Sequence, residues 1–309
     1  MTGRERITAI FEGKIPDKVP HFELVFYLWK EAFGVDFPNE KDENGCLTDR
    51  KIFIESFLDM WDRMLSAYDW AAIPVSYKVL GETGEMITLA KEHFGDKAAV
   101  FDYNGRGTFW MLPGDKMLDF AVRLYEDWDG LIEEAKYKRD ESIKLARLQI
   151  ERGADFICIN SDYGYNKGPF ISPEMFSELV TPFLKQIVDA IHSMGRKAIL
   201  HSDGDLRLIL DQLVSTGLDG YQSIDPQGNM DIAEVKTQYP DLILMGNVKT
   251  ALLQNVNNEE EIRQAARYAM KSAKQGGKFI FSSSNCIFKG LPLESYHIML
   301  DEYEKYAWY

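Results

Sequence analysis

Short apolar runs and longer runs with helical spacing alternate regularly along the second half of the chain. DFICIN (155–160) and KAILH (197–201) are short apolar runs typical of buried strands, and each is followed by apolar residues spaced as on one face of a helix. The same order predicts further strands at 219–224, 242–247 and 278–284, and helices at 130–152, 205–216, 231–239, 258–275 and 293–306. Strands that alternate with helices indicate β-α-β units and a parallel sheet.

The first half is less regular but supplies further strands. VPHFELVF (19–26) and WAAIPVSY (70–77) are strand-like, and helices are expected at 1–18 and 51–67. The stretch 97–112 consists of two β-like runs around Asn104-Gly105, a pair of residues that favours a tight turn. We therefore predict a β-hairpin insertion at 97–112.

One long helix is expected between the first two strands of the regular half. Ser172 is placed to cap it, Pro173 to take its first position, and Gly195 to end it, while Pro182 is expected to kink it. About eight strands in all favour an α/β fold of the (β/α)8 TIM-barrel type with an N-terminal helix and the hairpin insertion. A single catalytic domain over 1–309 suits a barrel, which needs about 250 residues.

Composition narrows the class of protein. The 309 residues carry 35 basic and 49 acidic side chains, a net charge of −14, which disfavours nucleic acid and anionic membranes as partners. No apolar run approaches the roughly 20 residues of a membrane span. Cys46, Cys158 and Cys286 lie far apart and no signal segment precedes them, so we expect a cytoplasmic protein.

In a barrel of this type the active site lies at the carboxyl ends of the strands. Polar residues follow the apolar runs at each of these ends. They are Glu23 in the first strand, Asn160 to Asp162, His201 to Asp203, Ser223 and Asp225, Asn247, and Ser282 to Cys286. If the fold is correct, these residues surround one mouth.

His201, Asp162 and Asp203 are the expected catalytic residues. A histidine at a strand end can bind a metal or move protons near neutral pH, although hydrogen bonding to a loop is its alternative role. Asp203 either faces the same mouth or caps the helix that begins near Asp205. Asp162 is either a base or ligand, or it organises the turn in which it lies.

The metal site predicted from these residues consists of His201, Asp203 and Cys286. Imidazole and thiolate both suit zinc, whereas inert packing is the alternative role of Cys286. Substrate contacts are expected from Glu23, Tyr163, Asn247 and Asn285, with core packing as the alternative for Tyr163.

Several segments resemble the uroporphyrinogen-decarboxylase-like superfamily. The opening RERITAIFEGKIPDKVPHF is similar to the start of its members, and DYGYNKGPFISPEMFSELVTPFLKQIVDAIHSMGRKAILHSDGD resembles its most recognisable stretch. MGNVKTALL, GGKFIFSSSN and LPLESYHIML are similar to its last two strands and terminal helix. The resemblance implies a (β/α)8 barrel.

The resemblance also implies one of two chemistries. True decarboxylases of this superfamily hold a many-carboxylate tetrapyrrole with arginines after the first strand, where this chain has ELVFYLWKEAFG. Corrinoid-dependent methyltransferases hold zinc with an H-x-C pair and a later Cys. Here the histidine is His201, Asp203 replaces the first cysteine, and Ser284 or Cys286 falls near the second.

The expected function is therefore that of a methyltransferase. It would move a methyl group between a small-molecule donor or acceptor and a corrinoid (cobalamin) carried by a separate protein, with zinc assistance. With a carboxylate in place of a cysteine, the metal site would have harder ligands. Such a site suits activation of an oxygen, as in the O-demethylation of a methoxylated aromatic. The alternatives are a decarboxylase of a small acid that uses Asp162 and His201 without metal, and a non-catalytic barrel that binds a corrinoid or an aromatic ligand.

Overall fold

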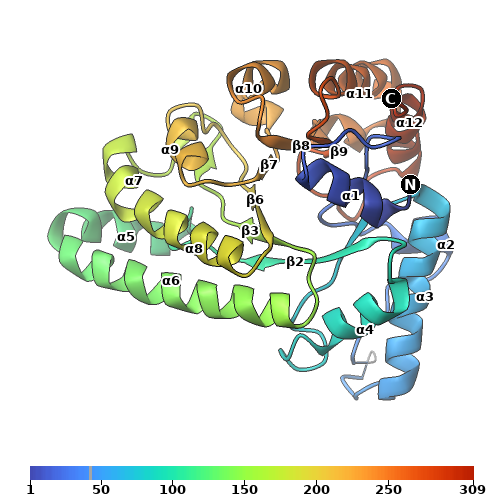
Figure 1. Cartoon of the computed structure of the whole chain (residues 1–309), viewed down its shortest axis with the longest axis horizontal. Helices are drawn as coiled ribbons and strands as arrows, with labels where there is room; N and C mark the ends of the chain where they lie inside the picture. Colours follow the sequence, from blue (N-terminus) through green and yellow to red (C-terminus); the bar gives the residue numbers. More distant parts are fainter. Residues whose placement is uncertain (42–43) are drawn as a thin grey trace.

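A curled parallel sheet forms the centre of the molecule (Figure 1). The computed structural model describes residues 1–41 and 44–309. In these residues seven strands pair in parallel in the order β1-β2-β3-β6-β7-β8-β9. Their bounds are Ala72–Pro74 (β1), Ala99–Gly105 (β2), Phe156–Asn160 (β3), Lys197–His201 (β6), Gly220–Gln222 (β7), Ile243–Val248 (β8) and Phe279–Ser283 (β9).

The segment around His21 closes the sheet into a ring. Phe281 N of β9 donates a hydrogen bond to Pro20 O at 2.9 Å, and Ala71 N, just before β1, donates to His21 O at 2.8 Å. His21 bridges Phe281 in parallel as well. The predicted strand at 19–26 is not a regular strand: the segment makes only isolated bridges at His21 and Phe26. It nevertheless fills the gap between β9 and β1, and the predicted α/β fold with a barrel-like parallel sheet is confirmed.

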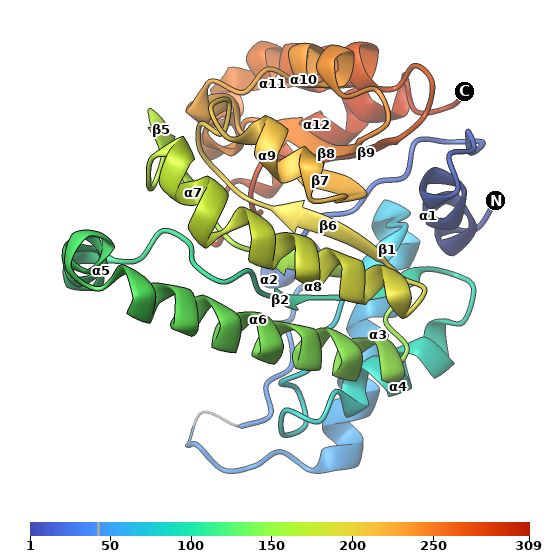
Figure 2. The same ribbon diagram turned by 60° about the vertical axis from the view of Figure 1, so that its left-hand side comes forward.

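Helices cover the outside of the ring, and α6 and α8 run side by side over one part of it (Figure 2). The long helices are α3 (Arg50–Tyr68), α6 (Trp128–Glu151), α8 (Thr181–Ser193), α11 (Glu259–Ala273) and α12 (Leu293–Glu304). α5 (Gly114–Glu126) is as long as α8, and the shorter helices are α1 (Gly3–Phe11), α2 (Trp29–Phe33), α4 (Glu85–Phe94), α7 (Pro173–Leu179), α9 (Leu210–Ser215) and α10 (Ile232–Gln238). None of the helices among the described residues is long and apolar enough to cross a membrane.

The predicted hairpin at 97–112 is wrong. Ala99–Gly105 is instead a ring strand, β2, which pairs in parallel with β1 and β3. Asn104-Gly105 marks its end: a Cβ on Gly105 would lie 2.4 Å from Cys158 O, so glycine permits the close approach of β3. A small antiparallel pair does occur after β3, between β4 (Gly164–Tyr165) and β5 (Gly168–Pro169).

The helix predicted from Ser172 to Gly195 is divided in two. Ser172 caps α7 through its hydroxyl, which accepts from Met175 N, as expected. The break comes at Val180, however, and α8 starts at Thr181 with Pro182 in its first turn. Proline fits there because the first N–H groups of a helix need no intrahelical partner.

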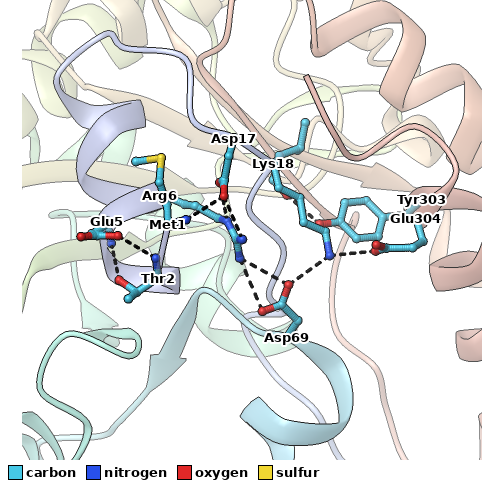
Figure 3. A network of polar contacts seen from close by, with 10 residues as sticks. Met1, Thr2, Glu5, Arg6, Asp17, Lys18, Asp69, Tyr303 and Glu304 are labelled. Carbon is cyan, nitrogen blue, oxygen red and sulfur yellow. Dashed lines mark hydrogen bonds and ion pairs between the residues drawn. The ribbon is translucent and has the colours of Figure 1, made fainter.

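Aromatic packing and ion pairs stabilise the amino-terminal side of the ring. Phe101 and Phe156 stack inside the barrel with their ring centroids 4.6 Å apart. Figure 3 shows the ion pairs around Asp69, which accepts from Arg6 at 3.3 Å and from Lys18 at 3.0 Å, while Lys18 also pairs with Glu304 at 2.8 Å. The packing and ion pairs on the amino-terminal side thus stabilise the fold.

Candidate active site

Asp162, His201 and Asp203 meet at the carboxyl ends of β3 and β6. One possible ligand atom from each lies within 4.8 Å of the others. His201 Nε2 is 3.6 Å from Asp162 Oδ1 and 4.0 Å from Asp203 Oδ2. Strand register explains the meeting, because Asn160 of β3 pairs with His201 of β6 and the chain continues from both strands into neighbouring loops. We refer to these three residues as the acid–histidine cluster.

The carboxylate of Asp203 is held inside the site. Its Oδ2 accepts a hydrogen bond from Asn285 Nδ2, whereas its Oδ1 is buried without a hydrogen-bond partner. Burial raises the pKa of Asp203, and the nearby His201 acts in the opposite direction. Asp203 does not cap a helix, since α9 begins at Leu210, so that alternative is wrong.

Asp162 contacts both the loop after β6 and His201. Its Oδ1 accepts a hydrogen bond from Asp203 N at 3.1 Å, so it organises the loop after β6. The same oxygen is the one that faces His201 Nε2. Asp162 therefore belongs to the cluster and also positions Asp203.

The donor set of the cluster fits a divalent metal. Two carboxylates and an imidazole are suitable ligands for zinc, and Asp203 Oδ1 is a buried acceptor that lacks a donor. Bonds of about 2.0–2.1 Å in tetrahedral geometry require ligand atoms roughly 3.3 Å apart, close to the 3.6 and 4.0 Å seen here. The residues that would hold the ion are Asp162, His201 and Asp203.

Cys286 lies outside this group of three, although it was expected to be a ligand. It follows β9 and is half-buried, and its pKa is raised by burial and by the negative charges of Asp203 and Glu23. A raised pKa disfavours the thiolate that zinc binds. In the structure Asp162, and not Cys286, lies with His201 and Asp203 in the group that could hold a metal ion.

Glu23 belongs to the segment that closes the ring, and it is fully buried. Its carboxylate accepts from Ser283 N at 3.0 Å and from Ser283 Oγ at 2.6 Å. Burial raises the pKa of Glu23 to about 8, although the bonds from Ser283 favour the charged form. Glu23 therefore keeps its proton at neutral pH.

The other expected substrate contacts are placed in different surroundings. Asn285 donates to Asp203, so it borders the cluster. Asn247 is buried at the end of β8, where its Nδ2 donates to Ile224 O at 3.1 Å. Tyr163 is fully buried among aromatic rings, with the Phe176 ring 5.1 Å away. This burial matches core packing, which was the alternative role for Tyr163.

Sequence reasoning did not include Gln222, which touches the cluster directly. Its Oε1 contacts His201 Nδ1, and its residue pairs with His201 in the β6–β7 register. The strand 219–224 was predicted, but Ser223 and the following Asp225 were chosen at its end. A strand buried on both faces has no polar–apolar alternation to show which residues face inward.

Gly204 allows the loop that carries Asp203 to pack tightly. It has a φ of +87°, and a Cβ there would lie 2.3 Å from Gly164 O. We expect Gly204→Ala to lower the free energy of unfolding by about 3 kcal/mol, since strain and a backbone clash combine. Gly195→Ala is the control: φ is +73° but nothing lies within 4 Å, so the cost should be about 1–2 kcal/mol. If urea denaturation shows the same loss of unfolding free energy for both variants, the expected clash at Gly204 is contradicted.

A groove of about 690 Å³ lies beside α6, and its lining includes Tyr77, Arg106 and Trp110. None of the cluster residues lines it. The loop after β2 connects the two regions, because Met111 N donates to Asp162 O at 2.7 Å. The groove thus lies next to the cluster loop without containing the cluster.

Comparisons with known proteins agree with this architecture. Residues 117–306 match the family model described as uroporphyrinogen decarboxylase (URO-D). The structure resembles a methyltransferase from Methanosarcina mazei with a TM-score of 0.74 and 15% identity, over 99% of both chains. At that identity the likeness shows a shared fold.

Two curated proteins are similar in sequence. The chloroplastic uroporphyrinogen decarboxylase of Nicotiana tabacum is 27% identical over 222 residues, which are 69% of this chain and 54% of that protein. The methylcobamide:CoM methyltransferase MtbA of Methanosarcina acetivorans is 25% identical over 128 residues, 41% of this chain and 36% of that protein. The matches thus span about half of the first relative and about a third of the second.

Proposed function

The chain belongs to the uroporphyrinogen decarboxylase (URO-D) family, and from that premise we propose that it is a methyltransferase. It moves a methyl group between a small substrate and a corrinoid carried by a separate protein. Asp162, His201 and Asp203 would hold a divalent metal, for which we propose zinc, and the chain forms one catalytic domain. The acid–histidine cluster is the observation that carries this proposal.

The charges inside the barrel argue against a tetrapyrrole substrate. Asp162 and Asp203 lie together at the carboxyl ends of the strands, and ELVFYLWKEAFG after the first strand contains no arginine. Acidic side chains gathered at the site repel a substrate with many carboxylates. The similarity to MtbA, a methyltransferase by its name, supports the other chemistry of the family.

The donor set supports our proposal that the substrate atom to be activated is an oxygen. Carboxylate ligands are hard donors, and a bound metal supplies Lewis acidity to a substrate oxygen, which makes a phenolate a better leaving group. We therefore propose a methoxylated aromatic as the substrate. The residues of the chain orient the ligands: Asn285 holds Asp203, and Asp162 holds the loop of Asp203 through its backbone N–H.

Incubation of the purified chain with zinc, a methoxybenzoate and free cob(I)alamin tests this function. The methyl–oxygen bond breaks, the methyl group joins cobalt, cob(I)alamin becomes methylcob(III)alamin, and one proton completes the phenol. We expect equal amounts of phenol and methylcobalamin, measured by chromatography and absorbance, and loss of turnover with a chelator. Carbon dioxide release from a small acid in the presence of the chelator would instead support a metal-free decarboxylase.

A further inference from the structure

Gln222 is the last residue of β7 and is fully buried beside His201. Its side chain spans the inside of the ring and contacts two neighbouring elements. Oε1 contacts His201 Nδ1, while Nε2 lies 3.4 Å from Ser283 O and 3.4 Å from Ser284 O. The amide therefore connects β6 to the end of β9.

The two carbonyl groups determine which way the amide points. A carbonyl oxygen only accepts hydrogen bonds, so Ser283 O and Ser284 O require the NH₂ group of Gln222 on their side. Ser283 is itself fixed, because its N and Oγ both donate to Glu23. Oε1 must then face His201, and an acceptor at that position requires the proton on Nδ1.

We propose that Gln222 is a positioning residue that fixes the ring and the tautomer of His201. With the proton on Nδ1, the lone pair of Nε2 points toward Asp162 and Asp203, as metal binding requires. The effect of Gln222 on metal binding rests on the proposed function, because it requires the cluster to be a metal site. The orientation of the amide is a property of the chain alone.

The two carboxylates of the cluster favour the tautomer of His201 that Gln222 disfavours. Asp162 and Asp203 lie 3.6 and 4.0 Å from Nε2, and their negative charge attracts a proton to that nitrogen. A proton on Nε2 of a neutral imidazole blocks metal binding there. The acceptor on the other side of the ring favours Nδ1–H instead and keeps Nε2 available.

Gln222→Met and Gln222→Glu separate this role from simple packing. Methionine has a similar shape but no acceptor, so a share of His201 should shift to Nε2–H and zinc affinity should fall by about 10–100-fold. Glutamate keeps an oxygen against Nδ1 and should preserve the Nδ1–H tautomer. Gln149→Met is the matched control, since Gln149 is also fully buried but donates to Asp102 on β2. It should change neither measurement.

The measurements are the side-chain ¹⁵N spectrum of metal-free protein at alkaline pH, with His201→Gln assigning the signal, and calorimetric titration with Zn²⁺ alone. Nε2–H in the unaltered protein, or an unchanged tautomer in Gln222→Met, would overturn the proposal. If Gln222→Met does not fold, the tautomer of His201 in the unaltered protein and in Gln222→Glu still tests the proposal. Nδ1–H with no zinc binding would leave the positioning role standing and contradict the metal-dependent function.

Discussion

His201→Ala should weaken zinc binding by more than roughly 100-fold, since loss of a direct ligand should exceed the loss known for outer partners of ligands. The variant keeps both carboxylates but loses the nitrogen that lies 3.6 Å from Asp162 and 4.0 Å from Asp203. Methyl transfer to cob(I)alamin should fall at least as far. Metal content after dialysis and initial rates of phenol release measure the two effects.

His192→Ala is the matched control for this loss. His192 also pairs with a carboxylate, since its Nε2 lies 2.7 Å from Asp219 Oδ2, but it belongs to α8 on the outside of the ring. It should leave zinc content and turnover unchanged. Retention of one zinc per chain by folded His201→Ala would exclude the acid–histidine cluster as the metal site. Circular dichroism establishes folding in both variants.

The barrel was predictable because each unit repeats the same signal. An apolar run followed by helical spacing located β3, β6, β8 and β9 within a residue or two. The segment 19–26 was also expected as a strand, and its backbone bonds on both sides show why it is needed. The hairpin predicted at 97–112 was wrong because Asn104-Gly105 is typical of a tight turn and equally of a strand end that β3 approaches closely.

The candidate site was predictable in its location but only partly in its contacts. His201 and Asp203 could be chosen because the end of an apolar run shows where the chain leaves the ring. Whether Asp162 or Cys286 lies nearer to them depends on how two loops fold over the mouth. The contact of Gln222 with His201 depends on the register between β6 and β7, which cannot be predicted from either segment alone.

Glu23→Gln should make the protein more stable than the unaltered chain at alkaline pH. The pKa of Glu23 is raised from 4.5 to about 8 in the folded state, mainly by burial. Between these values the unfolded state has lost the proton while the folded state still binds it, so stability falls as pH rises. At about 1.4 kcal/mol per pH unit, the difference between variant and unaltered protein grows to on the order of 5 kcal/mol and is constant above pH 8.

Urea denaturation across that pH range, with the variant compared at each pH, isolates this contribution from all other titrating groups. Glu302→Gln provides a control of opposite sign. Glu302 is buried too, yet ion pairs with Lys305 and Arg267 outweigh its burial and lower its pKa. Its replacement should therefore cost stability at neutral pH. The opposite result is a stability difference between Glu23→Gln and the unaltered chain that is the same at every pH. That result would show that folding does not raise the pKa of Glu23 and that Glu23 is ionised beside Ser283.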